Sequence, residues 1–393
     1  MTTEAQFDVN SRATIVTLVL IGSFAAFVLL TAPALVGAFL SQLQLTPQQA
    51  GYLISADMAG MGLATVPALV WLNRLNWRKV ALVALLLNAV CHLISALLDN
   101  YHGLLAARFC AGLFAGSAMS VCLASLGLTR EKDRNFGFWV VGQLVLGAAG
   151  LALLPRVTAQ WGVQWVYLFA AVCVALLSAF VGLLPQGPPR GQHQETEAAT
   201  RLSGDQLLKA ILGITAVYSF YAALSGVWAY LERIGFVSGL GADEIGQYLS
   251  IASLAGVAGA LSASCFGHRF GRSGPVSLGF VVIFGSLLML LGEIPALRYL
   301  LAACLFKYAW TFILPFVLAA LSAIDSSGRV IVTTNIFIGG GLATGPALAA
   351  TLIEGQYYTP IIWFGMTGML LSFLFVLPLI ARRNTESCAS GLI

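Results

Sequence analysis

Charge is scarce in this chain of 393 residues. Asp, Glu, Lys and Arg together make up 9% of it, whereas hydrophobic residues make up 59%. A soluble domain usually carries about a quarter charged residues, and the mean hydropathy here is +0.89. So few charges cannot cover so much apolar surface in water, but a bilayer accepts an apolar exterior. The composition therefore excludes one or two soluble domains and predicts a protein embedded in lipid.

Several chemical motifs are also missing. The sequence has four His residues and no H-E-x-x-H, its seven Cys residues are scattered without a C-x-x-C, and no Walker-type glycine loop occurs. A net charge of +4 without a long basic run gives no basis for binding nucleic acid. We therefore expect no metal, no cofactor, no enzymatic activity and no nucleic-acid partner.

Long apolar runs are plentiful, and about 20 such residues span a bilayer as a helix. Twelve runs meet this criterion, and we predict one membrane helix for each. They are residues 13–41, 47–71, 79–98, 103–128, 136–157, 162–184, 209–236, 243–266, 275–293, 296–323, 329–353 and 358–381.

Lys and Arg gather in alternate loops, which predicts the orientation of the chain. Basic residues follow the second, fourth, eighth and twelfth helices, as at Arg78, Arg134 and Arg382. The opposite loops 41–46 and 99–102 contain neither Lys nor Arg. Both termini are therefore expected in the cytoplasm, and we expect a monomer in the cytoplasmic (inner) membrane of a bacterium.

A polar segment divides the chain into halves. Residues 185–208 are rich in Pro, Gly and charge, which is typical of a linker. We predict an N-terminal six-helix bundle at 1–184, a cytoplasmic linker at 185–208 and a C-terminal six-helix bundle at 209–393.

An internal repeat supports this division. A single offset of 195 residues aligns polar, basic and glycine positions from the second helix of each half to the sixth. The pairs include Leu45 and Leu240, Gly51 and Gly246, Ser55 and Ser250, Arg74 and Arg269, Arg134 and Arg329, and Gly150 and Gly345. Parallel repeats of six helices are a known transporter architecture, so the fold class predicted is all-α, with two pseudo-symmetric bundles.

Two loop motifs and one helix motif resemble those of the major facilitator superfamily. Residues 73–79 read NRLNWRK and resemble that family's D-R-x-G-R-R/K loop, although Asn73 and Asn76 replace the Asp and the Gly. Residues 267–272, GHRFGR, keep the Gly-Arg part, and 108–116 resemble the family's R-x-x-x-G helix. The resemblance covers nearly the whole chain and implies a secondary transporter. The Gly-Pro motif of many family antiporters is absent from the fifth helix.

Four ionisable side chains stand out inside predicted membrane helices, where each costs roughly 2.5–3.5 kcal/mol. They are Asp57, Arg108, Glu232 and Lys307. Two are acidic and two basic, so they could share a nearly neutral cavity. The family resemblance implies that the first, fourth, seventh and tenth helices line such a cavity, and three of the four residues lie on these helices.

Lys307 is the candidate anchor for an anionic substrate, with Trp310 and Thr311 on the same helix face. The alternative is a structural ion pair with Asp57 or Glu232. A charge, an aromatic ring and a hydroxyl together suit an organic anion better than a sugar.

Glu232 is a candidate proton acceptor, because the protonated form of a carboxyl is favoured in an apolar cavity until a cation approaches. Its helix face also carries Tyr221, Ser225 and Trp228, which we predict to contact substrate. The alternative is a Glu at the outer end of the helix that pairs with Arg233.

Asp57 and Arg108 are the other candidates for proton coupling. Asp57 has small neighbours such as Gly60, and could instead fix a helix contact. Arg108 follows the family motif implicated in proton coupling, and could instead bond backbone carbonyls. His92 is a weaker candidate, since a lone His in an apolar helix is more often a packing residue.

Arg74, Arg78, Arg269 and Arg272 lie at the cytoplasmic ends of the second and eighth helices. They could hold the outward-facing state by binding helix C-termini or acids such as Asp133. The positive-inside rule alone would also explain them.

The sequence therefore favours a proton-coupled secondary transporter of a small organic solute, anionic or amphipathic, that works by alternating access. Its partners would be the solute, protons and the lipid bilayer. Proton-driven efflux of drugs or metabolites is the alternative in the same fold. A receptor or scaffold without transport is a third possibility, but it leaves the intramembrane charges unexplained.

Overall fold

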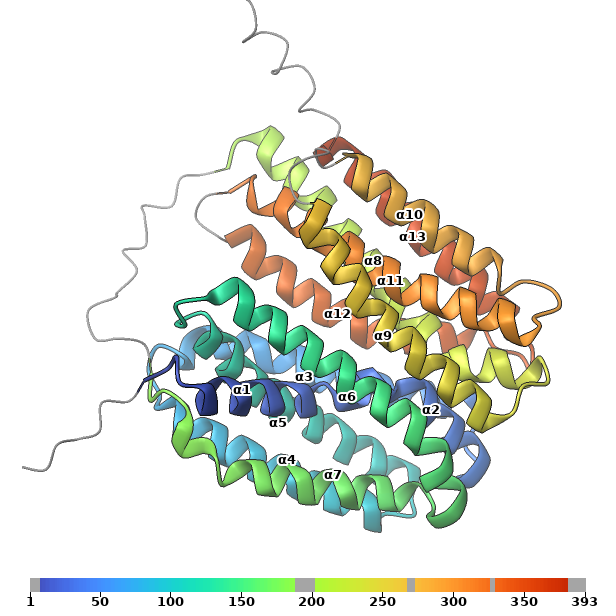
Figure 1. Ribbon diagram of the computed structural model, residues 1–393, viewed down its shortest axis with the longest axis horizontal. Helices are drawn as coiled ribbons and strands as arrows, with labels where there is room; N and C mark the ends of the chain where they lie inside the picture. The colour runs from blue at the N-terminus through green and yellow to red at the C-terminus, as the bar shows by residue number, and fades with distance from the viewer. Residues whose placement is uncertain (1–7, 188–201, 267–272, 326–328, 381–393) are drawn as a thin grey trace, which may run out of the picture. The chain divides into compact units, whose positions relative to one another are not determined.

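The computed structural model describes residues 8–187, 202–266, 273–325 and 329–380 (Figure 1). These residues fold almost entirely into α-helices, and no β-strand occurs among them. The chain divides into two compact units, unit 1 at Met1–His193 and unit 2 at Gln194–Ile393. The all-α, two-unit architecture expected from the repeat is confirmed.

Unit 1 contains seven described α-helices and a short 3-10 helix. They are α1 (Arg12–Ala25), α2 (Phe27–Gln42), α3 (Pro47–Trp71), α4 (Trp77–Leu97), α5 (Tyr101–Leu126), α6 (Lys132–Trp161), α7 (Val163–Ser178) and η1 (Val181–Leu183).

Unit 2 contains six α-helices in its described part. They are α8 (Gly204–Val237), α9 (Ala242–Phe266), α10 (Ser273–Leu288), α11 (Ala296–Ser322), α12 (Arg329–Thr351) and α13 (Thr359–Ile380). Helix α8 begins at Gly204, inside the segment predicted as linker. Ser203 and Gln206 form a capping box there, because each side chain accepts a hydrogen bond from the other's backbone N–H.

The first predicted helix, residues 13–41, is wrong as a single helix. Its backbone turns more tightly at Ala26, whose N–H donates to the Ser23 carbonyl three residues back, and α1 and α2 meet there. The hydropathy of the sequence does not indicate this tighter turn, because the turn leaves the apolar run unchanged. Arg12–Gln42 is still apolar and long enough for one membrane span.

Ten described segments, with α1 and α2 taken together, are long and apolar enough to cross a membrane. Two further apolar helices, α7 and α10, are shorter, with 16 residues each. They correspond to the predicted runs 162–184 and 275–293. The number of twelve spans therefore stays a prediction.

The two units have the same pattern of neighbouring helices. In unit 1, α5 packs against α3 and α4, α4 against α7, and α6 against α1 and α2. In unit 2, α11 packs against α9 and α10, α10 against α13, and α12 against α8. Each contact in one unit thus has a counterpart in the other, as the sequence repeat predicts.

Glycines allow the helices of unit 1 to approach closely. A Cβ atom on Gly112 of α5 would lie 1.9 Å from the Asp57 carbonyl oxygen of α3, and one on Gly60 would lie 2.1 Å from the Phe109 carbonyl oxygen. Gly259 has the same role in unit 2, where its Cβ would lie 2.3 Å from the Tyr308 carbonyl oxygen of α11. Small residues at helix contacts are typical of membrane bundles.

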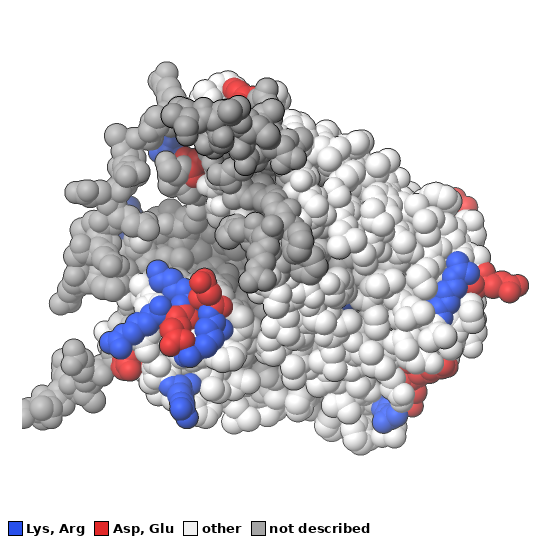
Figure 2. Space-filling model, turned by 45° about the horizontal axis from the view of Figure 1, so that its top comes forward, with Lys and Arg blue, Asp and Glu red and all other residues white. Residues whose placement is uncertain are grey.

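Apolar side chains form much of the outer surface. Leu97, Phe169 and Val281 are each more than 60% exposed. The broad middle of the face in Figure 2 is almost free of charged atoms, which gather toward its edges. Such a surface is compatible with lipid and not with water.

We expect Gly112→Ala to destabilise the protein strongly, by roughly 3 kcal/mol or more, because its methyl group would overlap the α3 backbone. Gly137→Ala in α6 is the matched control, since a Cβ there meets nothing within 4 Å and Ala favours a helix by about 1 kcal/mol over Gly. Thermal unfolding in detergent measures both. Equal melting temperatures would contradict the close contact between α3 and α5.

Candidate functional site

Lys307 lies in an aromatic cage in the middle of unit 2. Its Nζ atom lies 3.9 Å from the ring centroid of Trp228 on α8 and 4.0 Å from that of Trp310 on α11. Lys307 is 3% exposed. Tyr221 packs edge-on against Trp310, with ring centroids 6.5 Å apart. We call Lys307, Trp228, Trp310 and Tyr221 the lysine cage.

No carboxylate of the described residues forms an ion pair with Lys307. The alternative of a structural pair with Glu232 is therefore not realised. Taking an ammonium ion out of water costs several kcal/mol, whereas a desolvated cation–π contact contributes about 2 kcal/mol. The two indole rings thus offset much of this cost, and an anion that entered the cage would stabilise the ammonium group further.

Two predicted substrate residues have hydroxyl groups that serve helix packing. Thr311 Oγ1 donates to the Gly256 carbonyl of α9 at 2.7 Å. Ser225 Oγ donates to the Tyr221 carbonyl at 2.8 Å and lies 3.2 Å from the Gly341 carbonyl of α12. Substrate contact by these two residues stays a prediction, and the geometry favours the cage side chains over them.

A second charged cluster lies inside unit 1. Arg108 Nη1 of α5 lies 3.3 Å from Asp57 Oδ2 of α3, and the two side chains are 1% and 4% exposed. Arg108 Nε donates to Ser95 Oγ at 3.2 Å, and Nη2 lies 3.5 Å from His92 Nδ1, both on α4. The Tyr167 ring of α7 faces the guanidinium at 4.6 Å.

The close contact between α3 and α5 positions this pair. Gly112 lies one helical turn after Arg108, and its missing side chain lets the Asp57 backbone approach. The sequence left two roles open for Asp57, namely proton coupling and fixing a helix contact. Both roles concern the ion pair that Asp57 forms with Arg108.

Glu232 pairs with its neighbour Arg233 near the end of α8. Arg233 Nε and Nη2 donate to Glu232 Oε2 and Oε1 at 2.6 and 2.8 Å. Adjacent helical residues do not normally face each other, but Arg233 turns back and also covers the Phe236 ring at 4.4 Å. Glu232 is 5% exposed. The ion pair expected as the structural alternative is present, and its role in proton coupling stays a prediction.

Of the two predicted latch arginines in the described part of the chain, Arg74 and Arg78, Arg78 binds a backbone carbonyl near the end of unit 1. Arg78 Nε donates to the Leu184 carbonyl, just after η1, and the Trp77 N–H donates to the Gln186 carbonyl at 2.9 Å. Arg74 is exposed. Arg269 and Arg272 lie outside the described residues.

The sequence did not indicate every member of the two clusters. Tyr167 and Ser95 lie in apolar helices without any motif, and only the packing of α4 against α5 and of α7 against α4 brings them to Arg108. The pairing of Asp57 with Arg108 was equally hidden, because 51 residues separate them in the sequence. For Lys307, helical spacing did indicate Trp310.

An apolar helical protein of two related units, with ionisable groups buried inside each, has the architecture of a membrane transporter. The chain matches the family model of the Major Facilitator Superfamily over residues 15–328 and belongs to this family. It is thus an integral membrane protein of a transporter family and not an enzyme.

A curated relative is the "Probable sugar efflux transporter" of Mannheimia succiniciproducens. It is 25% identical over 267 residues, which are 66% of this chain and 66% of that protein. The chain therefore spans just under two thirds of the length of this relative.

Solved structures share the fold at low identity. The D-xylose-proton symporter has a TM-score of 0.72 at 14% identity, covering 92% of this chain and 96% of that one. The nucleoside transporter NupG has a TM-score of 0.69 at 16% identity, covering 93% and 98%. A bacterial homologue of the human lysosomal transporter Spinster has a TM-score of 0.64 at 14% identity, covering 93% and 95%. These similarities establish the fold alone.

We expect Asp57→Asn to destabilise the protein by about 3 kcal/mol, because it leaves the Arg108 charge buried without a counter-ion. The double variant Asp57→Asn/Arg108→Gln should recover much of this loss. The control is Glu131→Gln, which breaks the exposed pair with Arg134 and should cost less than about 1 kcal/mol. Thermal unfolding of these proteins and of the single variant Arg108→Gln completes the double-mutant cycle that measures the coupling, and strictly additive effects would contradict it.

Proposed function

We propose that this chain is a secondary active transporter that carries a small organic anion across the membrane by proton-coupled alternating access. The observation that carries the proposal is the lysine cage, in which a buried ammonium group contacts two indole rings and no carboxylate of the described residues pairs with it. The substrate carboxylate, phosphate or sulfonate would bind Lys307, and the rings of Trp228 and Trp310 would contact its apolar part.

The ion pair of Asp57 and Arg108 supports proton coupling. A carboxylate this deeply buried keeps its charge only while a cation lies beside it. A conformational step that withdraws Arg108 would leave Asp57 to take up a proton, and return of Arg108 would release it. The pair of Glu232 and Arg233 has the same chemistry in unit 2, nearer a helix end. Proton binding at either pair would then favour one access state over the other.

The basic loop after α3 fits a conformational latch. Arg78 and Trp77 bind the chain just after the last helix of unit 1, at Leu184 and Gln186. Arg74, Arg269 and Arg272 complete the latch in this proposal. The distribution of Lys and Arg favours both termini in the cytoplasm, and we propose a monomer in a bacterial cytoplasmic membrane.

Efflux is the second candidate, because the curated relative carries that word in its name. The aromatic residues of the lysine cage would also suit an amphipathic drug or metabolite. Expression of the chain in a drug-sensitive host separates the two directions. Broad resistance would favour efflux, whereas growth that depends on one nutrient anion would favour import.

Lys307→Ala should lower the initial rate of anion transport about 10- to 100-fold, since a hydrogen bond to a charged group contributes about 1.5–3 kcal/mol. Proteoliposomes with an imposed pH gradient and a panel of radiolabelled monocarboxylates, dicarboxylates, organic phosphates and neutral sugars measure this rate. Lys79→Ala, at an exposed lysine of the basic loop, is the matched control and should transport at the wild-type rate.

Glu232→Gln should flatten the dependence of transport on pH, because the amide cannot bind or release a proton. The same proteoliposomes, assayed across a series of external pH values, measure this dependence, with Glu354→Gln as the control at an exposed carboxylate of unit 2. If Lys307→Ala and Glu232→Gln both left transport and its pH profile unchanged, the proposed function would be refuted.

A further inference from the structure

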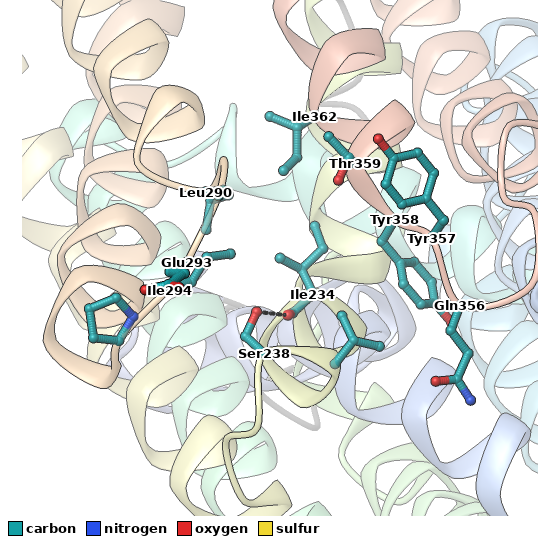
Figure 3. A pocket seen from close by; sticks show the side chains of 13 residues that line it. Ile234, Ser238, Leu290, Glu293, Ile294, Gln356, Tyr357, Tyr358, Thr359 and Ile362 are labelled. Atoms are coloured by element: carbon teal, nitrogen blue, oxygen red, sulfur yellow. Dashed lines mark hydrogen bonds between the residues drawn. The ribbon is translucent and has the colours of Figure 1, made fainter.

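Unit 2 contains a pocket at one end of its helices, and no residue of the lysine cage lines it (Figure 3). Its volume is about 600 Å³, within the usual range for small-molecule sites. The pocket lies where α8 ends, where the loop from α10 enters α11, and where the loop from α12 enters α13. Pro295, at the start of α11, lines it, and Lys307 follows twelve residues later. At 1.5 Å per residue this is about 18 Å along the helix axis.

The walls combine an apolar floor with aromatic rings and hydrogen-bond acceptors. Ile234, Ile294 and Ile362 supply apolar surface, and Tyr357 and Tyr358 supply rings. Ser238 Oγ also lines the pocket, and it donates its proton to the Ile234 carbonyl at 2.8 Å. The serine therefore presents lone pairs to a ligand, so that it acts as an acceptor.

Glu293 supplies the charge of the pocket. It is exposed, and its carboxylate has no ion-pair partner among the described residues. Arg298, the nearest arginine in the sequence, is occupied elsewhere. Its Nη1 donates to the backbone carbonyl of Glu293 at 2.9 Å, and its Nη2 donates to that of Leu291 at 2.8 Å. The loop thus satisfies the guanidinium with carbonyl groups and leaves the carboxylate free for a ligand.

The surroundings of the pocket are acidic as well. The segments that meet at this end of unit 2 carry four carboxylates, at Asp243, Glu244, Glu293 and Glu354, against the single guanidinium of Arg298. The charges of Glu232 and Arg233 cancel, because these two side chains form an ion pair. Acidic side chains around a concave site raise the local concentration of cations.

We infer that this pocket binds a small organic ammonium ion with an aromatic or aliphatic body. The ammonium group would pair with Glu293 on one side of the pocket, and the aromatic or aliphatic body would reach across to the isoleucines and to the rings of Tyr357 and Tyr358 on the opposite side (Figure 3). The ligand has the opposite charge to the anion proposed for the lysine cage. The pocket is therefore a second site and not part of the transport site.

Binding here would tie together three segments of unit 2, namely the end of α8, the start of α11 and the loop before α13. A ligand that favours the folded state raises its apparent stability. The inference stands independently of the proposed function, because no residue of the lysine cage takes part in it.

Thermal unfolding of the purified full chain in detergent tests this inference with three probes of one shape. Phenethylammonium should raise the melting temperature, whereas 2-phenylethanol and 3-phenylpropionate should raise it much less. Glu293→Gln should weaken the apparent affinity for phenethylammonium about tenfold or more, and Glu293→Asp should retain most of it. Both changes lie at an exposed position, so the fold should be preserved.

Two control variants separate this site from others. Glu354→Gln removes an exposed carboxylate of the same end that does not line the pocket, and it should leave the shift unchanged. Lys307→Ala should also leave it unchanged, even though this variant is expected to slow anion transport. Equal shifts for the three probes, or a shift that survives Glu293→Gln, would overturn the inference. Loss of the shift in Lys307→Ala would place the amine in the lysine cage and overturn it as well.

Discussion

The cost of a charge in an apolar interior is the constraint on which the internal arrangement of this protein depends. Each buried ionisable side chain in the described part of the helices must be offset by a partner. Arg108 is offset by Asp57, Ser95 and the Tyr167 ring, and Glu232 is offset by Arg233. Lys307 is different, because two indole rings contact it and no carboxylate in the described ranges pairs with it. That difference makes the lysine cage the proposed place for a substrate anion.

The same constraint explains why glycine and charge occur together in unit 1. The ion pair of Asp57 and Arg108 forms between two helices whose backbones nearly touch, and only glycine at position 112 permits that approach. Unit 2 repeats the close helix contact at Gly259, but the repeat partner of Gly112 is Lys307 itself. The two related units thus share their packing and differ in their buried charges, which lets each contribute a different chemistry to a transport cycle.

The sequence predicted the fold well. Hydropathy indicates the membrane helices, the basic loops indicate alternate sides of the membrane, and the repeat indicates two related units. The sequence did not predict the tighter turn at Ala26, which leaves the apolar run unchanged. The site was predicted in part. Helical spacing related Lys307 to Trp310, but the contact of Lys307 with Trp228 depends on the packing of α8 beside α11. The hydroxyl groups of Ser225 and Thr311 bond backbone carbonyls of neighbouring helices, which the sequence did not indicate, and their contact with substrate stays a prediction.

Two of the protein's eight tryptophans flank the Lys307 ammonium group, so intrinsic fluorescence tests the central claim most directly. Titration of the purified protein with organic anions should give a saturable change in tryptophan emission for at least one of them. The change should be absent with a neutral analogue of the same shape and lost in Lys307→Ala. An equal change in that variant, or a response that the neutral analogue reproduces, would contradict an anion site at Lys307.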